Sequence, residues 1–113
     1  MSVLKSFGYA FKGFATAVRE QRNLKIHLCV ALFVVAFGFW LNISGMDWCI
    51  ILIMVGLVIS AELFNTSLES LIDLVTKERH PLAGKVKDIA AAAVLILSVI
   101  SVIVGVIVFE KYV

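Results

Sequence analysis

The sequence predicts an all-α membrane protein, with an N-terminal amphipathic helix on the membrane surface and three membrane-spanning helices. Of its 113 residues, 62% are hydrophobic and 16% are charged, and the mean hydropathy is +1.07. Soluble domains contain about 45–50% apolar and about 25% charged residues. A chain this short cannot bury so many apolar side chains in a core of its own. This composition argues against a disordered, nucleic-acid-binding or ordinary cytosolic protein, and we expect one membrane domain over residues 1–113.

The first element is predicted over about residues 1–25. Apolar residues recur there at steps of three or four and form one stripe on a helix: Leu4, Phe7, Phe11, Phe14 and Val18. Most of the basic residues lie off this stripe. The pattern is typical of a helix on the membrane surface. A helix packed against the end of the bundle is the alternative, and both can hold together.

The three spans are predicted at about residues 27–44, 48–68 and 89–109. Each approaches or exceeds the ~20 apolar residues that a helix needs to cross a bilayer. The third contains no charged residue. No secretory cleavage pattern precedes the first span, which we therefore interpret as a membrane helix.

The basic residues predict the orientation. Five precede the first span, none lies in the connection 42–47, and four follow the second span. By the positive-inside rule, the N-terminus and the second connection are cytoplasmic. The connection 42–47 and the C-terminus then face outward.

One face of the second span carries the main functional signal. Glu62, Asn65, Glu69 and Asp73 are separated by three, four and four residues, so they share one side of a helix. A carboxylate within a span costs several kcal/mol and usually marks function. Oxygen ligands of this kind suit Mg²⁺. The alternative is that Glu69 and Asp73 form a solvated helix end paired with Lys77.

The next connection adds basic residues near a helix start. Pro81 is expected to break the second helix. Lys85, Lys87 and Asp88 are expected to open the third helix, just before the third span. A helix N-terminus with lysines nearby is a reasonable phosphate site. The alternative is that these lysines only mark topology. His27 and His80 are isolated in the sequence and predict no metal site.

Longer stretches of the chain resemble a known family. The run AELFNTSLESLIDLV, then HPLAGKVKDIAAAAVL, with GYAFKG and RNLKIHL nearer the N-terminus, is similar to the prokaryotic diacylglycerol kinase / undecaprenol kinase family. The resemblance covers almost the whole chain. It implies a small bacterial inner-membrane kinase that phosphorylates a lipid alcohol with ATP and Mg²⁺. It also implies a homotrimer whose sites are shared between neighbouring subunits at the cytoplasmic interface.

The resemblance implies roles for particular residues. Glu62 matches the catalytic base, Glu69 a metal ligand, and Asn65 and Asp73 the polar wall of the catalytic site. The positions that match nucleotide-binding ones are Tyr9, Glu69, Glu78, Arg79, His80, Lys87 and Asp88. One departure concerns the metal: the family's usual second glutamate is Gln21 here, and Glu20 lies one residue earlier. Both are kept as candidate metal ligands.

The lipid acceptor has two candidates. Pro81 directly after His80 makes the chain look more like the undecaprenol kinase branch, with diacylglycerol as the alternative acceptor. An inactive membrane scaffold and an ion transporter are the other hypotheses. A transporter would have acidic groups deep in several spans, whereas the first and third spans contain none.

Overall fold

The computed structural model describes residues 2–113 and consists of helices. The elements in order are α1 (Val3–Glu20), α2 (Arg22–Leu41), α3 (Gly45–Val75), α4 (Pro81–Phe109) and a short 3-10 helix, η1 (Glu110–Tyr112). No strand occurs within residues 2–113. Three helices are long and apolar enough to cross a membrane. The predicted all-α membrane fold, with one amphipathic helix before three apolar ones, is confirmed.

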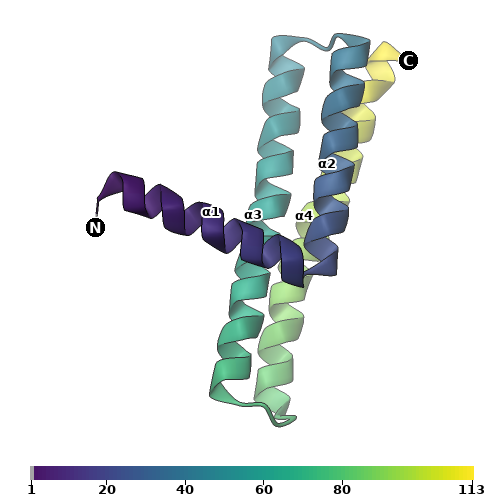
Figure 1. Cartoon of the computed structure of the whole chain (residues 1–113). Helices are drawn as coiled ribbons and strands as arrows, with labels where there is room; N and C mark the ends of the chain where they lie inside the picture. The colour runs from purple at the N-terminus through teal and green to yellow at the C-terminus, as the bar shows by residue number, and fades with distance from the viewer. Residues whose placement is uncertain (1) are drawn as a thin grey trace.

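The three long helices run side by side, and α1 projects sideways across them (Figure 1). The α2–α3 connection and the C-terminus lie at one end of the bundle, which we call the outer end. At the other end, α3 and α4 continue past α1 as an antiparallel pair. Helix α2 has 20 residues and is about 30 Å long, which equals the hydrocarbon thickness of a bilayer. Helix α3 has 31 residues, so roughly its last ten lie beyond that thickness.

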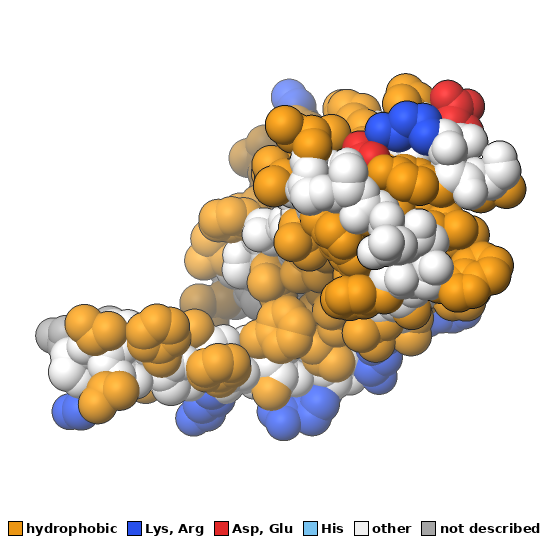
Figure 2. Space-filling view, turned by 90° about the horizontal axis from the view of Figure 1, so that it is seen from above, with side chains coloured by type: hydrophobic (Ala, Val, Ile, Leu, Met, Phe, Trp, Pro, Cys, Tyr) orange, Lys and Arg blue, Asp and Glu red, His pale blue; other side chains and the backbone are white. Residues whose placement is uncertain are grey.

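Helix α1 is amphipathic and begins at Ser2, whose hydroxyl accepts the backbone N–H of Lys5 at 3.3 Å. Seen along the bundle axis, hydrophobic side chains cover the α1 face toward the viewer and basic ones follow one edge (Figure 2). The helix ends at Glu20, because Gln21 is extended with φ −112° and ψ 114°. The segment predicted as one element over residues 1–25 is therefore divided, and residues 22–25 belong to α2. Burial of Ala17 and Leu24 on either side of Gln21 stabilises this corner.

The outer end is tightly packed. Asn42 ends α2 in the left-handed region with φ 53°, and the N–H of Ile43 donates to the carbonyl of Gly38 at 3.3 Å, as in a Schellman cap. A Cβ placed on Gly38 would lie 2.8 Å from Cη2 of Trp48. The small residue thus lets α2 approach α3 closely.

Both later helices extend beyond the predicted spans. Helix α3 continues to Val75 rather than to about residue 68, and α4 starts at Pro81 rather than at about residue 89. Proline is favourable at the first position of a helix because no intrahelical partner is needed there. His80 caps the start, since its Nδ1 accepts the N–H of Leu82 at 3.1 Å. Pro81 therefore begins α4, and Lys85, Lys87 and Asp88 lie in its second turn.

Candidate functional site

The polar face of α3 runs from the buried interior to solvent. Glu62 is 2% exposed and Asn65 is also buried, whereas Glu69 is half-buried and Asp73 is exposed. Glu62 lies 17 residues after the start of α3, about 26 Å along its axis. This places its carboxylate near the level at which α1 crosses the bundle.

The side-chain amide of Asn65 makes a hydrogen bond through its nitrogen but not through its oxygen within residues 2–113. Its Nδ2 donates to Oε1 of Glu69 at 3.2 Å. Its Oδ1 is buried and accepts no hydrogen bond from residues 2–113. A buried acceptor without a partner is unfavourable by about 1–3 kcal/mol. Such an atom is a candidate ligand position, because a bound cation or donor would satisfy it.

The structure places His27 beside Glu62, although the sequence did not mark His27 as a site residue. His27 on α2 lies with Nε2 at 3.6 Å from Oε2 of Glu62. The only local signal is helical spacing, since His27 follows Leu24 by three residues and shares its face. That this face is the inner one becomes visible only because Leu24 is fully buried.

The predicted metal ligands, all of which the structure describes, do not form a closed cage. Within residues 2–113, no three His, Cys, Asp or Glu side chains gather closely enough to form a metal cage. Mg²⁺ does not need one, because it is usually held by one or two carboxylates together with phosphate oxygens and water. Glu69 and the free Oδ1 of Asn65 fit that donor set.

The two candidates for a second metal contact are placed differently. Glu20, on the last turn of α1, lines a cavity of about 1010 Å³ between α1 and α3, together with Thr66 and Ser70. Gln21 is the half-buried corner residue and does not line this cavity. Glu20 therefore faces α3, although neither Glu69 nor Asn65 lines this cavity.

A second group of predicted residues lies at the α3–α4 turn. Nζ of Lys87 contacts Oδ1 of Asp73 at 2.9 Å, and both side chains are well exposed. The partner of Asp73 is thus Lys87 on α4, not Lys77, which lies beyond the end of α3 at Val75. A cavity of about 510 Å³ brings together five predicted residues: Asp73, Glu78, Arg79, His80 and Lys87.

Three predicted nucleotide residues lie outside that cavity. Glu69 lies on the polar face of α3 with Asn65. Asp88 is exposed on α4, and Tyr9 lines the cavity between α1 and α3 instead. Within one chain, the structure therefore brings together Glu62, Asn65 and Glu69 in one group and the turn residues in another. Tyr9 belongs to neither group.

A third cavity lies among the apolar helices. It measures about 380 Å³ and is lined by α2, α3 and the outer half of α4. Its lining is apolar except for His27 and Ser101. This cavity is a suitable environment for a hydrocarbon chain.

Comparisons with known proteins give consistent results. The chain matches the family described as prokaryotic diacylglycerol kinase over residues 8–109. It is 41% identical over 105 residues to the undecaprenol kinase of Bacillus subtilis (strain 168), covering 93% of this chain and 85% of that protein.

Other relatives are named diacylglycerol kinase, among them one from Synechocystis sp. and one from Escherichia coli. The chain is 38% identical over 105 residues to the diacylglycerol kinase of Synechocystis sp., covering 92% of this chain and 60% of that protein. It is 30% identical over 101 residues to the diacylglycerol kinase of Escherichia coli (strain K12), covering 89% of this chain and 83% of that protein.

Proposed function

Because this chain belongs to the prokaryotic diacylglycerol kinase family, it is a membrane lipid kinase that uses ATP, and we propose that its acceptor is undecaprenol. The product would be undecaprenyl phosphate. The identity with the Bacillus subtilis undecaprenol kinase supports this acceptor. Diacylglycerol is the second candidate, favoured by the names of the other relatives.

Glu62 is the proposed catalytic base, and its burial near the level of α1 is the observation that supports this assignment. We place this level near the cytoplasmic boundary of the membrane, since about 26 Å of α3 precede Glu62. An alcohol that stays in the bilayer can present its hydroxyl to a carboxylate at this depth. As the hydroxyl oxygen attacks the γ-phosphorus of ATP, the new O–P bond forms and the bond to the β-phosphate oxygen breaks, releasing ADP. The hydroxyl proton passes to Glu62.

The proposed ligands of Mg²⁺ are Glu69 and Oδ1 of Asn65, with Glu20 as the preferred second contact over Gln21. When bound, Mg²⁺ would neutralise charge on the phosphate oxygens. Asn65 also orients Glu69 through its amide N–H. One buried oxygen and one half-buried carboxylate leave room for phosphate and water ligands.

The proposed nucleotide residues continue along α3 and across the turn. Asp73 lies one helical turn beyond Glu69 and holds Lys87 at 2.9 Å. The ammonium group of Lys87 would offset charge on the phosphates, and Asp88 follows it on α4. The nucleoside would lie toward the turn cavity, against Glu78, Arg79 and His80.

The proposed assembly is a homotrimer with sites shared between subunits. Tyr9 lines a different cavity from Lys87 in the same chain. A neighbouring copy could bring these two groups to one nucleotide, which supports a shared site. The proposed location is the bacterial inner membrane, with the N-terminus and the α3–α4 turn in the cytoplasm and the C-terminus outside. The four basic residues from Lys77 to Lys87, with both included, support this orientation.

The test is a side-by-side assay of both lipids with the purified protein in mixed micelles, with ATP and Mg²⁺ held constant. We expect kcat/KM for undecaprenol to exceed that for diacylglycerol by about tenfold or more, a difference of roughly 1.4 kcal/mol in transition-state binding. The reverse ratio would assign diacylglycerol as the acceptor. Absence of turnover with either lipid would favour the inactive scaffold.

A further inference from the structure

We propose that His27 is a positioning residue that orients the Glu62 carboxylate toward the incoming lipid hydroxyl. This inference rests on the proposed function, in which Glu62 is the base. Nε2 of His27 lies 3.6 Å from Oε2 of Glu62, although the two residues come from different helices. Within residues 2–113, His27 is the only basic side chain within 4 Å of this carboxylate.

The other polar neighbours of Glu62 are engaged elsewhere. The amide N–H of Asn65 donates to Glu69, and the hydroxyl of Thr66 donates to the backbone carbonyl of Glu62 at 2.9 Å. An ionised carboxylate can accept about four hydrogen bonds. The 3.6 Å separation from His27 is slightly longer than a hydrogen bond. His27 is nevertheless a side chain from another helix that can favour one rotamer of Glu62, whose reacting oxygen must be accurately placed.

The imidazole is itself held in place. His27 lies one turn after Leu24, which is fully buried beside the α1–α2 corner. Its own side chain is 23% exposed. A fully buried neighbour on the same face fixes the rotation of α2, so the imidazole keeps its direction toward α3.

His27 also faces a cavity that suits the hydrocarbon chain of a lipid substrate. It lines the apolar cavity between α2, α3 and α4, with Ser101 as the other polar residue there. The imidazole thus lies between a cavity suited to a hydrocarbon chain and the carboxylate that takes the hydroxyl proton. A group in this place can align both the base and the alcohol.

Three substitutions of His27 test the proposal on the full-length protein. His27→Gln keeps an N–H donor near the position of Nε2, His27→Asn carries it closer to the backbone, and His27→Phe has none. We expect His27→Phe and His27→Asn to lower kcat roughly tenfold with KM for ATP changed less than about twofold, and His27→Gln to stay within about threefold of wild type. Cys29→Ala, at an exposed position on the same helix, is the control and should keep wild-type kcat.

The decisive measurement is a double-mutant cycle with Glu62→Gln. If His27 acts through Glu62, adding His27→Phe to Glu62→Gln should change the residual rate less than about twofold. The inference would be overturned if the losses in kcat of the two single variants multiplied in the double variant, or if His27→Gln and His27→Asn had equal kcat. The comparison of these last two variants remains available if His27→Phe fails to fold. Wild-type kcat in Glu62→Gln alone would instead refute Glu62 as the base, which is a separate outcome.

Discussion

Helix α3 carries two buried carboxylates, and their surroundings differ. Asp47 is 3% exposed at the outer end of the helix, and Glu62 is 2% exposed just past its middle, near the level at which α1 crosses the bundle. Burying a charge is unfavourable unless hydrogen bonds and opposite charges compensate for it. The two residues differ in how much compensation they receive.

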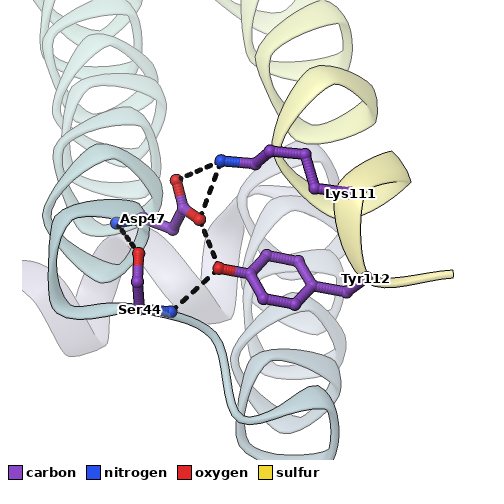
Figure 3. Close-up of polar contacts among 4 residues, drawn as sticks. All are labelled: Ser44, Asp47, Lys111 and Tyr112. Atoms are coloured by element: carbon purple, nitrogen blue, oxygen red, sulfur yellow. Dashed lines mark hydrogen bonds and ion pairs between the residues drawn. The ribbon is translucent and has the colours of Figure 1, made fainter.

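Asp47 is fully partnered (Figure 3). Nζ of Lys111 donates to both of its carboxylate oxygens at 2.9 Å, and the hydroxyl of Tyr112 donates to Oδ2. The N–H of Ser44 donates to the same Tyr112 hydroxyl at 3.0 Å, and the N–H of Asp47 donates to Oγ of Ser44 at 3.2 Å. These contacts tie η1 and the C-terminus to the start of α3.

Glu62 has only the imidazole of His27, and nearby Oδ1 of Asn65 has no partner within residues 2–113. The comparison separates two uses of a buried carboxylate. A carboxylate whose hydrogen bonds are all made holds elements together, because losing any donor leaves a buried charge uncompensated. A carboxylate with few partners, beside a free acceptor, is available for a ligand, and such sites commonly occur where function requires them.

The largest effect is expected for Glu62→Gln. We expect kcat for lipid phosphorylation to fall by about 10²–10⁴, because the base that takes the hydroxyl proton is lost. The thermal denaturation midpoint in detergent should stay the same or rise, since a buried charge has been removed. Lipid phosphorylation at near wild-type rate would show that Glu62 is not the base.

The next largest effect is expected for Glu69→Gln. The Mg²⁺ concentration that gives half-maximal rate should rise by about tenfold, because one anionic ligand becomes neutral. A Mg²⁺ titration of the rate at saturating ATP measures this shift. Glu20→Gln should shift the titration in the same direction and Gln21→Ala should not; the opposite pattern would assign the second contact to Gln21.

A smaller and different effect is expected for Asp47→Ala. The denaturation midpoint should fall by roughly 5 °C or more, because the C-terminal contacts are lost and Tyr112 and Lys111 lose their acceptor. The kcat of the folded protein should remain within about threefold of wild type. Glu110→Ala removes an exposed carboxylate at the same end and is the matched control. A loss of kcat in Asp47→Ala without a change in the midpoint would contradict the structural role.

Features that depend on local periodicity could be read from the sequence. The amphipathic stripe of residues 4–18, the three apolar helices and the shared face of Glu62, Asn65 and Glu69 follow from spacings of three and four residues. The corner at Gln21 could not be predicted, because no glycine or proline marks it and packing of Ala17 and Leu24 decides it. The partner of Asp73 was also missed, since pairing with Lys77 assumed that the helix continues past Asp73 by another turn. Helix α3 instead ends at Val75, and the contact comes from Lys87 on α4.

Hydropathy and helical period act over a few neighbouring residues, so the sequence alone indicates a membrane protein, its three apolar helices and the polar face of one of them. The contacts of Glu62 with His27 and of Asp47 with Lys111 and Tyr112 depend on tertiary packing. These partners are 35, 64 and 65 residues apart, and their contacts depend on how the helices pack. A buried carboxylate in the same helix thus becomes a structural anchor at the outer end and a candidate base near the middle.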